Sequence, residues 1–467
     1  MTSVLITIGR GTGTPIKQQL YDQIRKKIIK GELAFGDKLP SSRELADELH
    51  ISRNLIVEVY EQLVSEGYLE TKAGSGTYVA KGAYLERSFD SDEYSVFGEH
   101  LVAEEDVIDF RSGIPALDMF PRKTWGFIAR RVYRDAPPEV FGYRHPEGEF
   151  ILRHTLSQYL SRTRGVKCHP DQLIITSGAT QAFGLIARLL GSRNSEVVIE
   201  DPVTHEIQTI FSSAGFRFHP VPVDDYGMKT EHISAQNPAF IFVTPSHQFP
   251  LGGVLTIQRR IQLIHFARQT GCYIVEDDYD SEFRYHGTPV SCMQGLDPER
   301  VVYIGTFSKI LSPALRLGYL VLPPDLTKKC RDLKWFSDLH SSTFEQLVLA
   351  QFMKEGHLEK HISKMKKIYR KRREKLIDCL NKRFSNTVSI HGDSTGLHLV
   401  AEFKGITFSD ETMRNIDAHR VKVYPVELHT IQKSAHSNKI ILGYGNLGLE
   451  QIEEGIARLE SVLKYSY

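Results

Sequence analysis

One lysine stands in a stretch whose residue types suit covalent chemistry. Lys309 follows residues 301–304 and precedes residues 318–322, two apolar runs typical of buried strands. Burial there disfavours the ammonium form, and a neutral amine condenses with an aldehyde to give a Schiff base. Thr306 and Arg316 are donors suited to a phosphate. These types favour a site for pyridoxal 5′-phosphate (PLP), which combines both groups; the alternative is a surface loop with an ordinary lysine.

An acidic stretch upstream supplies two further groups. Residues 272–276 have the pattern of a buried strand, and Asp277 and Tyr279 follow at its end. A PLP site needs a carboxylate beside the pyridine nitrogen and a phenol near O3′ of the ring. Residues two apart on an extended segment point to the same side, so this pair fits both roles. The neighbouring acids leave open a solvated turn or a cation site, but no glycine stands where a calcium loop needs one, and we expect no metal.

Five motifs, in this order, resemble those of one family. They are SGATQ at 177–181, EDP at 200–202, TPSHQFP at 244–250, EDDYDSEF at 276–283 and GTFSK at 305–309. From about residue 108 to the C-terminus the chain resembles the fold-type-I aminotransferase domain of MocR-type regulators. The resemblance implies an α/β domain that holds PLP on Lys309 and serves for sensing, without efficient turnover.

A turn between a strand and a helix is the expected phosphate site. Residues 173–176 have the strand pattern, and Ala179 and Thr180 open a helix rich in apolar residues. Backbone N–H groups at a helix N-terminus bind phosphate. The turn lacks the glycine patterns of nucleotide loops, so the phosphate site is predicted from the resemblance and not from the turn alone.

The resemblance assigns two further positions near the cofactor. Tyr143 lies in a segment whose tyrosine reaches the cofactor phosphate of the neighbouring subunit, which implies a head-to-tail homodimer; the alternative is a core tyrosine. Relatives place an aromatic ring on the pyridine where this chain has Thr204, and the adjacent His205 is the only ring available to stack.

Two departures from the family concern the effector. Residues 440–447 are expected to form the strand on which aminotransferases and a γ-aminobutyrate-sensing relative carry an arginine. This chain has Asn446 on it, and Glu206 replaces a second arginine. Losing a charge-assisted pair forfeits about 1.5 to 3 kcal/mol, and a glutamate repels a carboxylate. We therefore expect PLP itself to be the signal, controlling vitamin B6 synthesis genes. The alternatives are an amino acid or dipeptide held by other groups, or a working aminotransferase with an added DNA-binding module.

The N-terminal residues predict a DNA-binding unit. Apolar spacing predicts a helix over 15–29, Ser41 or Ser42 can cap a short helix to Leu49, and Ser52 caps a helix over 53–66. Two helices so arranged form a helix-turn-helix, whose second helix reads base edges. A hairpin follows, and its small tip suits a minor groove.

Residues 10–80 resemble the GntR-type winged helix-turn-helix. The resemblance implies double-stranded operator DNA as partner. The expected contacts are Arg43, Ser52, Arg53, Asn54, Lys72, Gly74 and Gly76. The alternative for Arg53 and Asn54 is a solvated helix surface.

Composition limits the remaining possibilities. The chain has 467 residues, 41% hydrophobic and 25% charged, which suits two or three globular domains. It shows no membrane span or signal pattern, so we expect a cytoplasmic protein. Five scattered cysteines predict core thiols, with neither disulfides nor a zinc site.

Domain boundaries follow from composition and the two resemblances. We expect the DNA-binding domain over 10–80, an acidic linker over 81–107 and the aminotransferase-like domain over 108–467. The basic segment 357–382 is most simply a solvated helix face, with DNA backbone contact as the lesser alternative.

Overall fold

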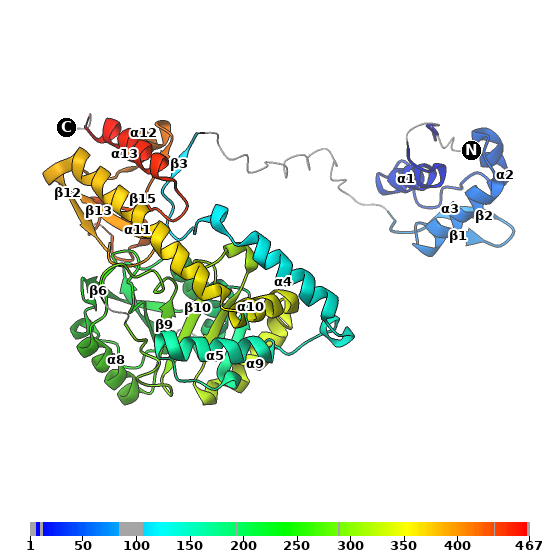
Figure 1. Cartoon of the computed structure of the whole chain (residues 1–467). Helices are drawn as coiled ribbons and strands as arrows, with labels where there is room; N and C mark the ends of the chain where they lie inside the picture. Colours follow the sequence, from blue (N-terminus) through cyan, green and yellow to red (C-terminus); the bar gives the residue numbers. More distant parts are fainter. Residues whose placement is uncertain are drawn as a thin grey trace. The chain divides into compact units, whose positions relative to one another are not determined.

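The chain folds into two compact units, Met1–Val102 and Ala103–Tyr467, in a computed structural model (Figure 1). The structure describes residues 6–9, 13–83, 106–192, 195–287, 290–433 and 435–464. Most of the predicted linker, residues 84–105, lies outside these ranges. Within them, no helix is both long enough and apolar enough to cross a bilayer.

The N-terminal unit has the three helices and the hairpin that the sequence predicts. They are α1 (Ile16–Ile29), α2 (Ser42–Leu49), α3 (Arg53–Ser65), β1 (Leu69–Lys72) and β2 (Gly76–Val79). Ser41 caps α2 in a capping box with Glu44, and the Ser52 hydroxyl accepts from the Leu55 N–H at 3.4 Å. Leu20 and Ile56, one from α1 and one from α3, are fully buried in a shared core. The caps thus fix where α2 and α3 begin, and the core fixes how they pack.

An eight-stranded sheet forms the centre of the second unit (Figure 1). Its order is β4 (Leu173–Thr176), β11 (Gly318–Val321), β10 (Val301–Thr306), β9 (Tyr273–Asp278), β8 (Phe240–Val243), β5 (Glu196–Asp201), β6 (Arg217–Asp224) and β7 (Gly227–Met228). Strands β10, β9, β8, β5 and β6 run parallel, whereas β11 is antiparallel to both neighbours. Parallel neighbours bring the carboxyl ends of β8, β9 and β10 to one edge, where the expected site residues follow.

Helices bury both faces of this sheet. They are α4 (Arg122–Asp135), α5 (Phe150–Arg164), α6 (Ala179–Leu190), α7 (His205–Ser213), α8 (Ile257–Thr270), α9 (Pro324–Asp338) and α10 (Thr343–Lys354). Ile175 and Tyr319 pack in a cluster with α5 and α10, whereas their neighbours Ile174 and Leu320 pack in a cluster with α6 and α9. Alternate strand residues point to opposite faces, so strands covered on both sides appear in the sequence as continuous apolar runs.

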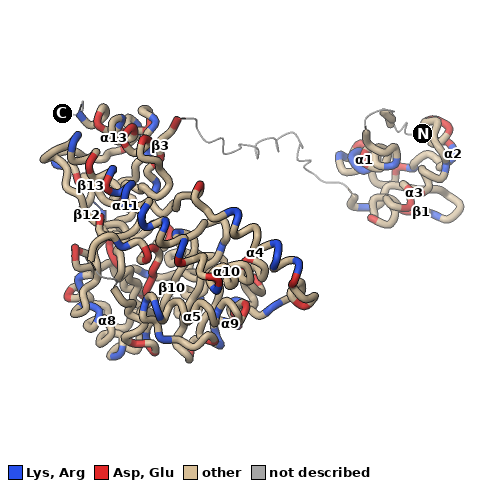
Figure 2. The backbone as a smooth tube through the Cα atoms, in the orientation of Figure 1, with Lys and Arg blue, Asp and Glu red and all other residues tan. Residues whose placement is uncertain are grey.

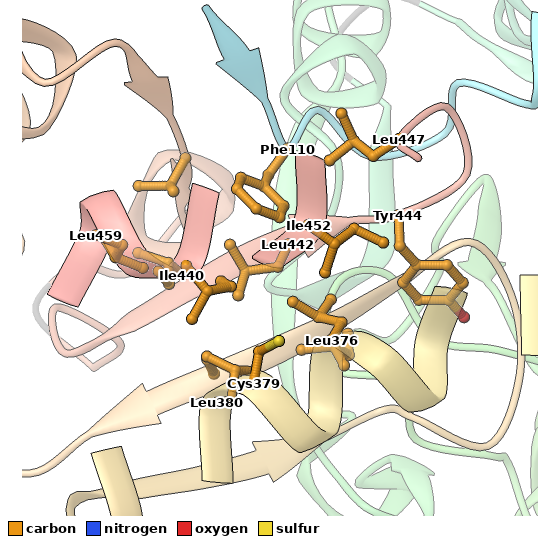
Figure 3. Packing of buried hydrophobic residues seen from close by; sticks show 14 of the residues in the cluster. Phe110, Leu376, Cys379, Leu380, Ile440, Leu442, Tyr444, Leu447, Ile452 and Leu459 are labelled. Carbon is orange, nitrogen blue, oxygen red and sulfur yellow. The ribbon is translucent and has the colours of Figure 1, made fainter. Parts of the chain in front are cut away.

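A smaller layer completes the unit. Its antiparallel sheet has the order β12 (Val388–His391), β13 (His398–Phe403), β16 (Lys439–Gly443) and β15 (Tyr424–Pro425). The helices are α11 (His357–Phe384), α12 (Asp410–Ala418) and α13 (Leu449–Leu463). Figure 3 shows Phe110, Leu376, Ile440 and Ile452 meeting in the core between them. Because β3 (Ile108–Asp109) pairs with β14 (Val421–Lys422), the start of the domain is tied to this layer.

Short 3-10 helices connect the larger elements. They are η2 (Leu117–Met119), η3 (Pro138–Phe141), η4 (Pro170–Gln172), η5 (Thr230–His232), η6 (Pro313–Leu315), η7 (Ser385–Thr387) and η8 (Val426–His429).

The prediction of a solvated basic face on α11 is partly wrong. Figure 2 shows Lys and Arg along this helix, but Arg372 and Arg373 are only 8% and 5% exposed. Arg372 donates to the Gly445 carbonyl, and Arg373 pairs with Asp393 at 2.5 Å. Long side chains here reach backbone and carboxylate acceptors inside the layer, a possibility that charge spacing alone does not reveal. Of the predicted core thiols, four are buried and Cys168 is partly buried.

Candidate cofactor site and DNA-binding surface

Lys309 lies in the turn that follows β10, three residues beyond the last strand residue, Thr306. Its side chain is partly buried, and burial lowers the pKa of its amine, against the opposing attraction of Asp280 and Asp277. A methyl group at Gly113, where φ is +74°, would lie 2.6 Å from Lys309 Nζ. Glycine at this position therefore leaves the amine the room that an aldehyde partner needs.

Asp277 is a buried carboxyl without a partner. It lies on β9 beside Ile304 of β10, and its Oδ1 accepts no hydrogen bond. Burial raises its pKa to about 8, with the neighbouring Asp278 and Asp280 adding to the effect. An orphaned buried carboxyl of this kind calls for an N–H or cationic partner. The nitrogen of a protonated pyridine ring meets that requirement, so this residue fits PLP.

Tyr279 joins a buried polar group behind the site. Its hydroxyl donates to the His247 carbonyl at 3.1 Å. His247 Nδ1 lies 3.1 Å from both carboxylate oxygens of Asp280, and its Nε2 is buried without a partner. His398 donates through Nε2 to the Pro250 carbonyl at 3.0 Å, and burial lowers its pKa to about 3. The group therefore leaves one buried nitrogen, His247 Nε2, without a partner beside Tyr279.

The sequence interpretation missed the pairing of His247 with Asp280. These residues follow β8 and β9, which are adjacent parallel strands, so their side chains meet at one edge of the sheet. The rule that carboxyl ends of parallel strands converge would have found the pair once the strand order was known. Together with His398 they bring ligand-type atoms within 4.8 Å of one another.

Two of the acids next to Asp277 have partners within the protein. Glu276 accepts from the backbone N–H of Met293 at 2.9 Å, and Asp278 pairs with Arg164 at 2.7 Å. Glu276 and Asp278 are two residues apart on β9 and lie on one face of the sheet, whereas Asp277 between them points to the other face. The clustered charges in the sequence are thus distributed among different local partners.

A phosphate cup lies where β4 leads into α6. Gly178 has φ +87°, and Arg316 donates through Nη2 to the Ser177 carbonyl at 2.7 Å. A methyl group at Gly178 would lie 2.6 Å from that nitrogen. Ala179 and Thr180 open α6, and helix geometry leaves their N–H groups without intrahelical acceptors. Free amides beside a guanidinium suit a phosphate dianion.

Thr306 lies beside this cup at the end of β10. It is buried, and its Oγ1 lies 3.1 Å from the Ser308 hydroxyl. The hydroxyl pair therefore lies between the strand and Lys309, and a role for Thr306 at the phosphate stays a prediction.

Tyr143 is 80% exposed, so the alternative of a core tyrosine is wrong. Its ring makes an edge contact with His340, with centroids 6.4 Å apart. His205 is exposed as the first residue of α7, and its N–H donates to His429 Nδ1 at 3.2 Å. Thr204 caps α7 by accepting from the Ile207 N–H at 3.3 Å. A stacking role for His205 stays a prediction.

The placement of Asn446 on a strand is wrong. β16 ends at Gly443, and Asn446 Oδ1 beyond it accepts from the Leu117 N–H at 3.3 Å. The strand itself carries no arginine, and Ile441 is buried in an apolar cluster against which Tyr279 packs. The conclusion that this strand has no arginine to bind a carboxylate therefore depends on the residues of β16 and not on Asn446.

The expected DNA contacts lie on the surface of the N-terminal unit. Ser52, Arg53 and Asn54 are exposed at the start of α3, and Arg43 is exposed in the first turn of α2. Arg53 donates through Nε to the Ser42 hydroxyl at 3.3 Å, which links the two helices. The Arg53 guanidinium is thus held at the start of α3, and its contact with DNA stays a prediction.

The β1–β2 hairpin presents the wing. Gly74 and Gly76 have φ of +72° and +119°, and Lys72 Nζ lies 4.9 Å from the centre of the Tyr78 ring. A groove of about 1390 Å³ separates the hairpin from α2 and α3. Lys38 lines it with its stem against Gly76, a contact that the sequence interpretation did not identify.

Comparisons with known proteins support the assignment of both domains. Residues 105–433 match the model of class I and II aminotransferases, and residues 16–79 match that of bacterial regulatory proteins of the gntR family. The aminotransferase-like domain resembles the multiple substrate aminotransferase of Thermococcus profundus, with a TM-score of 0.72 and 27% identity, covering 78% of this chain and 93% of that one. Fold and site thus define a DNA-binding regulator whose larger domain binds PLP.

Full-length relatives share this organisation. The chain is 36% identical over 461 residues to the HTH-type transcriptional regulator YdeL of Bacillus subtilis, covering 98% of each. It is 32% identical over 471 residues to the probable rhizopine catabolism regulatory protein MocR of Rhizobium meliloti, covering 98% of this chain and 95% of that one. Identity to the HTH-type pyridoxine biosynthesis transcriptional regulator PdxR of Corynebacterium glutamicum is 30% over 387 residues, 83% of each. The chain belongs to the MocR-type regulators of transcription.

Proposed function

We propose that PLP, bound as a Schiff base to Lys309, is itself the signal that changes how this regulator binds DNA. The observation that carries the proposal is the orphaned Asp277 carboxyl, which lies within electrostatic reach of the Lys309 amine. The residues for the ring, the amine and the phosphate are all present, whereas β16 lacks an arginine to grip an effector carboxylate. The relative PdxR is named for pyridoxine biosynthesis, which supports vitamin B6 genes as the target.

Titration of the cofactor-free protein with PLP tests this proposal. Binding to the DNA upstream of its own gene should change in affinity or footprint over the concentration range in which Lys309 becomes modified. Borohydride reduction followed by mass analysis of the peptide containing residue 309 reports that modification. Saturation of Lys309 without any change in DNA binding would remove PLP as the signal and leave it as a bound cofactor.

An amine effector is the second candidate, and charges near Lys309 favour it. Glu206 and Arg111 both act electrostatically on the lysine, so the site offers a group of each sign to a zwitterionic amine. Such an amine would exchange with Lys309 on the cofactor. A shift in visible absorbance on adding amino acids, lost in Arg111→Ala, would support this candidate. Steady turnover with an amino donor and a keto acid would instead indicate a working aminotransferase.

We further propose a head-to-tail homodimer acting in the cytoplasm, where its DNA lies. Exposed aromatic side chains occur on α4, on and just after η3, and on α9 of the second unit; they include Phe127, Tyr133, Phe141, Tyr143 and Phe336, each at least 52% exposed. Exposed apolar area of this kind is typical of an interface. Tyr143 would then reach the phosphate bound by the partner.

Mixed dimers test the shared site. Lys309→Ala and Tyr143→Ala should each bind PLP poorly alone. A heterodimer of the two contains one site with an intact Lys309 and, from the other chain, an intact Tyr143. Recovery of about half of the parent PLP content supports a shared site, whereas no recovery places Tyr143 outside it.

A further inference from the structure

A buried lysine lies directly behind the phosphate cup. Lys334, on α9, is completely buried. A buried ammonium is costly unless each of its three N–H donors finds an acceptor. Burial lowers its pKa, and the adjacent Asp338 opposes that shift. Lys334 is not one of the expected site residues, and it lies outside the five aminotransferase-like motifs.

The ammonium bridges α9 to the first turn of α6. It donates to Asp338 Oδ1 at 2.8 Å, to Ser341 Oγ at 3.2 Å and to Gln181 Oε1 at 3.3 Å. Gln181 Oε1 also accepts from the Ser177 N–H at 2.8 Å. The lysine thus holds, through one amide, the backbone at the beginning of the cup.

The same residues are fixed from the other side. The Ser177 carbonyl accepts from Arg316, and the Ser341 hydroxyl donates to the Ile175 carbonyl on β4 at 3.3 Å. The Gln346 amide donates to the Ser341 carbonyl at 3.0 Å. The turn that carries the free amides of α6 is therefore held at two backbone groups of Ser177, its N–H through Gln181 and Lys334 and its carbonyl by Arg316.

We infer that Lys334 is a positioning residue for the cofactor phosphate. It fixes the Ser177–Gln181 turn so that the α6 amides and Arg316 converge on one phosphate position. Lys334 itself reaches Gln181 and not the free amides, so its effect is exerted through the turn. Loss of this support should weaken the grip on the phosphate and leave the pyridine and aldehyde contacts unchanged. The inference rests on PLP binding at this site, and not on PLP being the signal.

Paired titrations with PLP and pyridoxal, which lacks the phosphate, test the inference. In full-length protein, Lys334→Met should raise the Kd for PLP about tenfold, as expected for a loosened charge-assisted contact, and change the Kd for pyridoxal less than about twofold. Equilibrium dialysis measures both constants without requiring a Schiff base. The matched control is Lys329→Met, an exposed lysine on the same helix, which should change neither constant.

A second variant guards against a folding defect. Lys334→Met/Asp338→Leu replaces the ion pair with apolar groups, which proteins often tolerate well, yet it still removes the contact with Gln181. It should show the same selective loss of PLP. Equal losses for PLP and pyridoxal, or no loss in either variant, would overturn the inference. If the parent protein retains PLP in dialysis but borohydride does not fix it to Lys309, the Schiff base is contradicted. The inference about Lys334 would still stand, because it concerns the phosphate.

Discussion

The two units hold their functional residues in opposite surroundings. Arg53 and Asn54, the predicted DNA contacts, stand exposed on α3. Asp277 is buried in the second unit and lacks a hydrogen bond on Oδ1, and Lys309 beside it is partly buried with a lowered pKa. The first surface acts by contacts that a charged partner completes, whereas the second site is prepared in advance by burial. Substitutions should therefore affect the two regions in different ways.

The largest expected effect comes from substituting Lys309, which should affect cofactor binding and leave DNA binding unchanged. Lys309→Ala should abolish borohydride-fixed cofactor and weaken PLP binding by about 100-fold or more, because the covalent link is gone. Mass analysis of the reduced peptide measures the first change, and dialysis the second. DNA binding by the cofactor-free variant should equal that of the cofactor-free parent, and the exposed Lys329→Ala serves as control. Fixation that persists in the variant would place the reactive amine elsewhere.

Removing the Asp277 charge should have a pH-dependent effect on the second region. With its pKa raised to about 8 from 3.8, folded cofactor-free protein holds a proton that the unfolded chain has lost. Its stability should therefore fall as the pH rises from about 4 to about 8. Asp277→Asn cannot ionise, so its melting temperature should fall less steeply over that range, while its PLP affinity drops about tenfold or more.

Melting curves of the cofactor-free parent and the Asp277→Asn variant at matched pH values make this comparison. Glu276 is buried in both proteins and is not among the charges that act on Asp277, so its titration cancels in the difference. Glu200 does act on Asp277, so the difference reports Asp277 together with this neighbour. Parallel pH slopes for the two proteins would show that Asp277 is ionised throughout this range, which would contradict a pKa raised by burial.

Arg53→Ala should weaken DNA binding about 10- to 100-fold, the range for a lost base contact, without changing PLP affinity or melting temperature. Its side chain is exposed and makes one hydrogen bond, to Ser42, so little folding energy is at stake. Fluorescence anisotropy with operator DNA measures the change. Lys26→Ala, an exposed cation on α1, is the control for general attraction to phosphate. Equal small losses in both variants would mean that Arg53 is only solvated surface.

The smallest effect concerns the fold of the first region. Ser41→Ala removes a capping box from α2 and should cost the N-terminal unit about 1 kcal/mol of stability. Hydrogen exchange of amides in α2 and α3 measures this loss. Protection in the second unit should not change. Ser65→Ala removes a hydroxyl that bonds only to the Gln62 carbonyl, and it should have less effect.

Local signals predicted much of the architecture. Serine caps and helical spacing placed α2 and α3 within a residue or two, and apolar runs placed β4, β9, β10 and β11. The site residues Lys309, Asp277 and Tyr279 were predicted because each follows or ends such a run. Asn446 was placed wrongly because an apolar run does not show where its strand stops pairing.

The sequence by itself determined the two kinds of domain, their elements and the residue types of the cofactor site, because caps and periodicity act between near neighbours. Only the tertiary structure decided that Gly113 makes room for Lys309, that His247 meets Asp280 and that Lys334 supports the phosphate cup. These contacts join residues far apart along the chain. They depend on strand order and on desolvation, which arise only when the whole sheet and its covering helices have formed.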